Sequence, residues 1–133
     1  MLSMSDNHLY EYAILRIVPK VEREEFVNVG VIVFCKKADF LEVRIQLNRD
    51  RINAFSHELD LDEVEKNLEA IRKVGHGECK ESAIAQMEKP ERFRWLTAVR
   101  SSSLQTSRPH VGLTKDLAQQ LIELEKELSL IHI

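Results

Sequence analysis

The segment from Phe26 to Cys35 constrains the fold of this chain more than any other. It reads Phe-Val-Asn-Val-Gly-Val-Ile-Val-Phe-Cys, and its β-branched and aromatic residues favour a strand that is covered on both faces. Asn28 and Gly30 interrupt the run on the face of Phe26, which indicates a β-bulge or, alternatively, a spot that contacts a ligand. The opposite face is expected to carry Val27, Val29, Val31, Val33 and Cys35.

Two neighbouring segments also have strand patterns. Residues 9–18 are rich in β-formers on both alternating faces and end before Pro19. Residues 40–47 alternate strictly, which is typical of a strand with one buried and one wet face. The apolar positions are Leu41, Val43, Ile45 and Leu47, and the polar ones are Glu42, Arg44 and Gln46. We therefore predict an antiparallel hairpin in which 40–47 lies nearer to water than 26–35.

Helical periodicity follows the strands. Residues 61–74 place apolar side chains on one stripe, with Asp60 as N-cap and Gly75 at the end. Residues 116–130 repeat leucine at helical spacing, which predicts a packed core helix or, as the alternative, a seam for a partner or a second copy. Shorter helices are expected at 48–56 and at 81–88, where Pro90 stops the second one.

These elements predict a single α+β domain over residues 9–133, preceded by a flexible tail at residues 1–8. Its small antiparallel sheet would have three to four strands, the fourth within residues 99–107, and two main helices would cover it. A chain of 133 residues is long enough for one core and too short for two.

Charge and cysteine content narrow the classes of function. The 19 basic and 22 acidic residues give a formal charge of −3, so an overall basic footprint for nucleic acid is absent. No apolar run approaches the roughly 20 residues of a membrane span, and no secretory signal is visible. Two cysteines alone form neither a disulfide framework nor a closed zinc site. We expect a cytoplasmic protein without cofactor or metal, in which Cys35 is a buried core residue.

The composition of residues 92–112 is not that of a segment that only supports the fold. They contain four arginines, the only tryptophan and a run of hydroxyl side chains, without any acid. If these residues form a strand, neither of its two faces can bury much apolar surface. Guanidinium, hydroxyl and amide groups suit the binding of an anion, a phosphate or a peptide backbone. The alternative is an edge strand whose arginines pair with the acidic residues of 58–69.

The candidate binding residues come mainly from this segment. They are Arg94, Trp95, Arg100, Ser101, Gln105 and His110, together with Asn28 and Arg16. His110 is either a hydrogen-bonded structural residue or a general acid or base.

Two blocks of sequence resemble a known family. The first runs from Tyr12 through Arg16 to Ile32, and the second is Arg92-Phe93-Arg94-Trp95-Leu96-Thr97-Ala98 with Gln105 and His110 further on. In these blocks the chain resembles the bacterial domain of unknown function 3037. The resemblance implies an accessory or regulatory protein, because members are often encoded beside kinases similar to the HipA-type serine/threonine toxins.

The first functional hypothesis is a non-catalytic interaction module. It would bind a protein partner, such as a HipA-like kinase, or an anionic ligand through segment 92–112. The alternative is a small enzyme acting on a phosphate ester or nucleic acid, with Arg94 and Arg100 as anion clamp and His110 as general acid or base. Binding of nucleic acid with Trp95 stacking is a third, which the net acidity disfavours.

Overall fold

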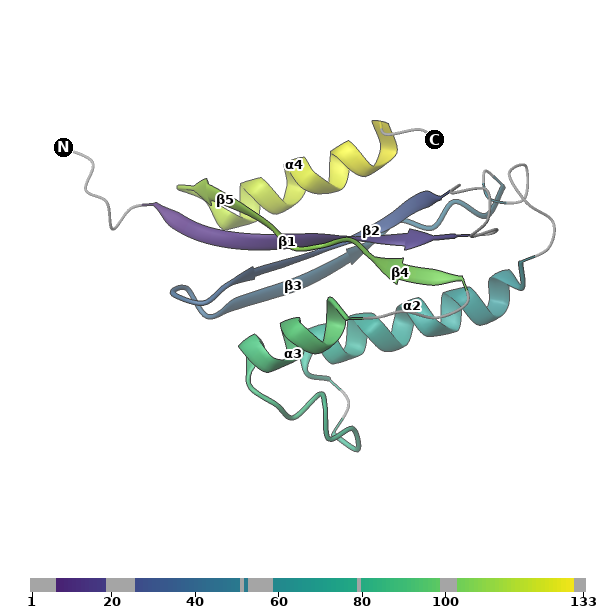
Figure 1. Cartoon of the computed structure of the whole chain (residues 1–133), viewed down its shortest axis with the longest axis horizontal. Coiled ribbons are helices and arrows are strands. Elements are labelled where there is room, and N and C mark those ends of the chain that lie inside the picture. The colour runs from purple at the N-terminus through teal and green to yellow at the C-terminus, as the bar shows by residue number, and fades with distance from the viewer. Residues whose placement is uncertain are drawn as a thin grey trace.

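The protein has a five-stranded antiparallel sheet between two layers of helix (Figure 1). The computed structural model describes residues 7–18, 26–50, 52, 59–78, 80–98 and 103–130. The strands are β1 (His8–Ile17), β2 (Val27–Cys35), β3 (Phe40–Ile45), β4 (Leu104–Thr106) and β5 (His110–Thr114), and the helices are α2 (Leu61–His76), α3 (Lys89–Leu96) and α4 (Leu117–Leu130). The predicted α+β class is confirmed, although the sheet has five strands instead of three or four.

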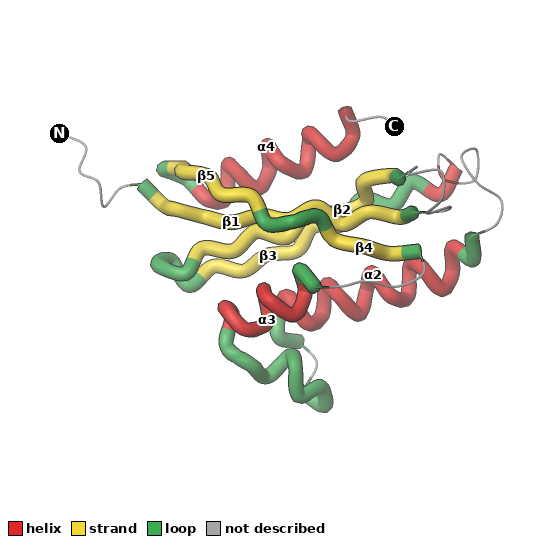
Figure 2. Tube along the Cα trace, in the orientation of Figure 1, coloured by secondary structure: helices red, strands yellow, loops and turns green. Residues whose placement is uncertain are grey.

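Strand β1 lies at the centre of the sheet. It pairs with β2 on one side, and β3 continues the sheet beyond β2. On its other side β1 pairs with β5 along its first half and with β4 along its second half (Figure 2). Ser107 joins the two, because its N–H donates to the Ile14 carbonyl at 2.8 Å and its Oγ accepts from the Ile14 N–H at 2.9 Å. The short strands β4 and β5 thus form one interrupted edge.

Both faces of the sheet are covered, as the apolar pattern of residues 9–18 and 26–35 predicted. Helices α2 and α3 cover one face and α4 covers the other (Figure 1). The core under α2 and α3 includes Leu15, Ile17, Ile32, Phe34, Leu68 and Leu96. The core under α4 consists of Tyr10, Val31, Val33, Cys35, Leu117, Leu121 and Leu124. The three α4 leucines confirm the packed-helix interpretation, and Cys35 is fully buried as expected.

A bulge in β2 corrects the expected valine face. The pairing with β1 passes from Leu15↔Gly30 to Arg16↔Asn28 and leaves Val29 without an opposite residue. Val29 therefore packs into the core under α2, whereas Val31 packs under α4. The bulge also moves Asn28 to the α4 face, away from the face predicted for it.

Gly30 occupies this bulge because a side chain would not fit. A Cβ atom there would lie 2.9 Å from the Arg44 carbonyl oxygen and 3.0 Å from Leu15 Cδ1. The bulge predicted from Asn28 and Gly30 is thus confirmed at the backbone level.

Helix boundaries differ from the predicted ones for local reasons. Asp60 caps α2 as expected and accepts from the Glu63 N–H at 3.2 Å. The helix does not end at Gly75, which is buried against Val43; it ends at Gly77, whose φ of 67° is the left-handed conformation that favours glycine. Segment 81–88 forms turns instead of the predicted helix. Helix α3 begins after it, because Pro90 fits a first helical turn, where no N–H is needed.

The remaining predictions concern the edges of the fold. Strand β3 is confirmed as the wetter strand of its hairpin, since Arg44 and Gln46 are exposed and Glu42 is half-buried. His8 already belongs to β1, although it was assigned to the tail. In segment 48–56, residues 49, 50 and 52 are helical and Asn48 is not, and residues 51 and 53–56 lie outside the described residues. No helix in the described part of the chain has the length and apolar character to cross a membrane.

Candidate binding site

Three predicted site residues meet on one rung of the sheet. Arg16 of β1 lies opposite Asn28 of β2 on one side and opposite Gln105 of β4 on the other. Neighbouring strands are about 4.8 Å apart, so the three Cα atoms span roughly 10 Å. All three side chains lie on the α4 face, because Leu104 and Leu15 turn to the opposite core. We call Arg16, Asn28 and Gln105 the polar rung.

The polar rung has polar atoms that are buried and unsatisfied. Within the described residues, Arg16 Nε and Asn28 Oδ1 are shielded from solvent and have no hydrogen-bond partner. The Arg16 guanidinium carbon lies 4.5 Å from the centre of the Phe26 ring, which gives the cation an apolar support. Burial lowers the pKa of Arg16 from its ordinary value, although an arginine remains charged at neutral pH. A partly desolvated charge that has no partner is unfavourable unless a ligand forms an ion pair with it.

Three other arginines of the chain form ion pairs with carboxylates. Arg49 lies 2.6 Å from a carboxylate oxygen of Glu65, and Arg72 lies 2.6 Å from one of Glu69. Arg44 is 3.3 Å from Glu42. Arg16 differs from these three, since among the described residues no carboxylate forms an ion pair with it.

His110 lies on the same face as the polar rung but further along β1. It pairs with Tyr12, and the two ring centres are 5.2 Å apart. Tyr12 and Arg16 are four residues apart in one strand, which corresponds to roughly 13 Å. His110 is exposed and thus flanks the polar rung without touching it.

The structure separates Arg94 and Trp95 from this group. Both belong to α3, which covers the opposite face of the sheet. Arg94 lines a groove of about 560 Å³ whose other charged walls include Glu11, Lys36 and Glu91, above the stacked rings of Phe34 and Phe93. Trp95 is 41% exposed. Arg100 and Ser101 lie outside the described residues.

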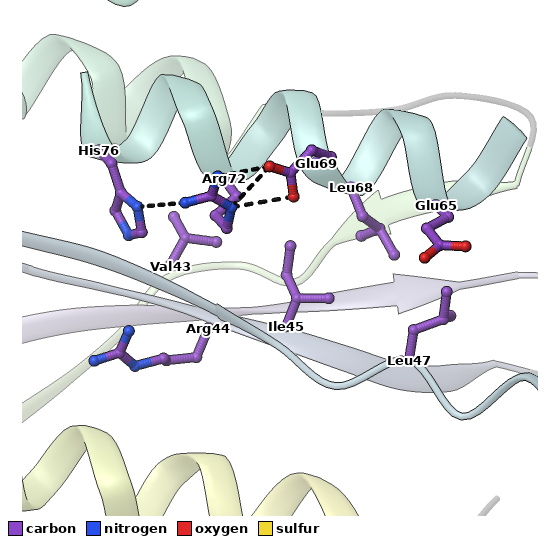
Figure 3. Close-up of a pocket in the computed structure, with 9 residues that line it drawn as sticks. All are labelled: Val43, Arg44, Ile45, Leu47, Glu65, Leu68, Glu69, Arg72 and His76. Carbon is purple, nitrogen blue, oxygen red and sulfur yellow. Dashed lines mark hydrogen bonds and ion pairs between the residues drawn. The ribbon is translucent and has the colours of Figure 1, made fainter. Parts of the chain in front are cut away.

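A second groove, of about 440 Å³, lies between β3 and α2 (Figure 3). Arg72 dominates its wall and donates to Glu69, to Glu78 and, at 3.1 Å, to Nδ1 of His76. Because Nδ1 accepts, neutral His76 carries its proton on Nε2, which faces Glu42 Oε2 at 3.4 Å. These hydrogen bonds raise the pKa of Arg72 and lower the pKa of Glu69.

Arg72 in this groove has carboxylate partners, in contrast to Arg16, although His76 Nε2 is buried there without a hydrogen-bond partner among the described residues. The alternative explanation of the arginines in segment 92–112 is that they pair with the acidic segment 58–69. In the described part of the chain its carboxylates pair with Arg49 and Arg72, and no ion pair with segment 92–112 is present. Sequence reasoning missed this groove, although the spacing of Glu69 and Arg72 was a readable signal for a pair on one helix face.

Comparison with known proteins identifies the family. A family model described as "Protein of unknown function (DUF3037)" matches residues 12–128. The chain belongs to the DUF3037 family. The match includes all three residues of the polar rung as well as His110 and Arg94. No curated protein and no solved structure gives a significant match to the chain.

Proposed function

We propose that this DUF3037 protein is a non-catalytic interaction module that binds an acidic group of a protein partner at the polar rung. The observation that carries the proposal is the partly buried charge of Arg16, which has no carboxylate partner among the described residues and lies beside two amide side chains. Gln105 connects the polar rung to segment 92–112, the stretch whose composition predicted a recognition surface. A HipA-like kinase, which the family resemblance implies, is the first partner to test.

The chemistry of the polar rung suits a peptide better than a bare anion. The Arg16 guanidinium offers parallel N–H donors to a carboxylate. Asn28 Oδ1 has the opposite need, because it is an acceptor that lacks a donor. An aspartate or glutamate of a partner provides a carboxylate and a nearby backbone N–H together. A free carboxylate such as acetate provides only the acceptor, and phosphate lacks the fixed spacing between carboxylate and backbone N–H.

The enzymatic alternative has less support. It requires an arginine clamp and His110 to converge on one substrate. Arg94 belongs to the helix that covers one face of the sheet, whereas His110 shares the other face with Tyr12.

The test is a binding measurement with a HipA-like kinase, followed on the Nε–Hε NMR resonance of Arg16. Binding should shift this resonance, and Arg16→Met should weaken the complex by about tenfold or more, because a charge-assisted pair is lost. Arg108→Met is the matched control, since Arg108 is an exposed arginine of the same segment outside the polar rung. Acetate and phosphate serve as small probes and should shift the resonance only weakly. Equal affinity of wild type and Arg16→Met would refute the proposal.

A further inference from the structure

Strand β3 is the last strand on its side of the sheet. In the described part of the chain its only strand partner is β2. The Gln46 N–H donates inward to the Val29 carbonyl at 2.7 Å, so in an antiparallel ladder the alternate residues Arg44 and Glu42 also turn inward. The backbone N–H and C=O groups of Leu41, Val43 and Ile45 therefore point outward.

The side chains along this edge are self-complementary. Glu42 and Arg44 both lie on the α4 face, and their side chains are 30% and 47% exposed. If two copies of β3 pair antiparallel about Val43, residue 42 of each copy lies opposite residue 44 of the other. Two attractive Glu–Arg pairs result, and all outward backbone groups of Leu41, Val43 and Ile45 find partners.

The same charges select the register. A slip of two residues in one direction would place Arg44 opposite Arg44 of the second copy. A slip in the other direction would place Glu42 opposite Glu42. Like charges directly opposite one another are destabilising, so only the pairing centred on Val43 satisfies both side chains.

The opposite face of the edge is apolar. There the pairing would set Val43 against Val43 of the second copy and Leu41 against Ile45, which extends the apolar row of β3. It would also place a strand along the open side of the groove between β3 and α2 (Figure 3). In the single chain Glu42 lies 3.3 Å from Arg44 of its own strand and 3.4 Å from His76, and pairing would exchange these contacts for Arg44 of the second copy.

The other edge of the sheet does not offer such pairing. It consists of the short strands β4 and β5, which Ser107–Pro109 interrupt with a proline. Short strands and proline are common features of edges that avoid pairing. We infer that β3 is a homodimer interface, through which two copies join their sheets about a twofold axis at Val43. This inference does not depend on the polar rung, which lies on β1, β2 and β4.

The test is sedimentation equilibrium of the full chain with a set of charge reversals. Wild type should form a dimer in a concentration-dependent way. Glu42→Arg and Arg44→Glu should each weaken it by about tenfold or more, because each creates two like-charge pairs. The double variant Glu42→Arg/Arg44→Glu should restore dimerisation. Glu123→Arg, an exposed site on α4, is the matched control and should behave as wild type. Thermal melts verify that each variant folds.

Hydrogen exchange gives a residue-level readout on the unaltered chain. The outward amides of Val43 and Ile45 should become protected as protein concentration rises, while the inward amide of Arg44 stays equally protected throughout. A wild type that remains monomeric at millimolar concentration would overturn the inference and make Glu42 and Arg44 edge-blocking charges. A dimer that tolerates both single reversals, for instance one formed through α4, would overturn it as well.

Discussion

The two faces of the sheet differ in the size of their cores and in the pairing of their arginines. Among the described residues, the face under α2 and α3 buries more than twice as many side chains as the face under α4, and its arginines Arg49 and Arg72 have carboxylate partners. The α4 face has a smaller core, and beyond Ile14 it carries Arg16, which has no carboxylate partner among the described residues. Buried polar atoms without a hydrogen-bond partner in the described chain occur on both sides of the sheet, His76 Nε2 and Arg92 Nε on the helices of the larger core and Arg16 Nε and Asn28 Oδ1 on the α4 face. The α4 face differs because two of these atoms belong to residues that lie opposite one another in the sheet.

The largest expected difference between the faces concerns core truncation. Leu68→Ala should lower the free energy of unfolding by about 4 kcal/mol, because Leu68 is 1% exposed in the larger core and leaves a cavity. Leu121→Ala should cost about 2–3 kcal/mol, since α4 packs on the sheet alone and can settle into the space. Urea denaturation measures both. Equal losses would mean that the two faces contribute alike.

The cysteine of the α4 face provides the next test. Cys35→Ser should lower the free energy of unfolding by about 1–3 kcal/mol, because the hydroxyl would be buried among Val31, Val33 and Tyr10 without an assured partner. Binding at the polar rung should not change. Rapid reaction of native Cys35 with a thiol reagent would contradict its placement in this core.

Much of the fold could be predicted because the spacing of apolar residues along the sequence indicates which side of each helix or strand is buried. The strict alternation of Leu41–Leu47 and the leucine repeat of 117–124 identified a strand and a helix with their correct buried sides. The valine face failed at Val29, because a bulge changes which way every preceding residue points and its position depends on pairing with another strand. Strand β5 was missed, since five residues that include Gly112 carry little pattern of their own.

The candidate site could be predicted only in part for a related reason. Arg16, Asn28 and Gln105 were selected individually, from a family block, a broken strand pattern and a polar segment. Their meeting on one rung depends on strand order, which joins residue 16 to residue 105. Arg94 was grouped with His110 by closeness in sequence, but a helix and a strand direct them to opposite faces.

The substitution Arg16→Met tests whether Arg16 serves binding or stabilises the fold. The substitution should leave the free energy of unfolding unchanged or raise it by up to about 1 kcal/mol, because a similar apolar volume replaces a partly desolvated charge that has no ion-pair partner among the described residues. Thermal and urea melts of the variant check this. A loss of about 2 kcal/mol or more would show that Arg16 is part of the scaffold and would weaken the contrast between the faces.

The smallest effect concerns the paired charges of the α2 face. The hydrogen bond from Arg72 lowers the pKa of Glu69, so the folded chain holds that proton less tightly than the unfolded chain. The stabilisation is therefore present above the ordinary glutamate pKa and is lost as pH falls through the lower folded value. Wild type should melt slightly above Glu69→Gln at pH 7, and the difference should disappear once the pH has fallen through the lowered folded pKa of Glu69. High salt should shrink the difference, because the pair is exposed.

The central position of β1 has a consequence for how the chain acquires its fold. Its partners on one side come from β2, close in sequence, but those on the other side come from residues 104–114, roughly a hundred residues later. Closing such long loops before any contact forms is slow, so we expect folding in the millisecond-to-second range instead of microseconds. During synthesis, β1 leaves the ribosome before β4 and β5. One edge of β1 therefore has no strand partner until those two strands have been made. A nascent chain paused before residue 104 should therefore be the species that chaperones bind or that aggregates.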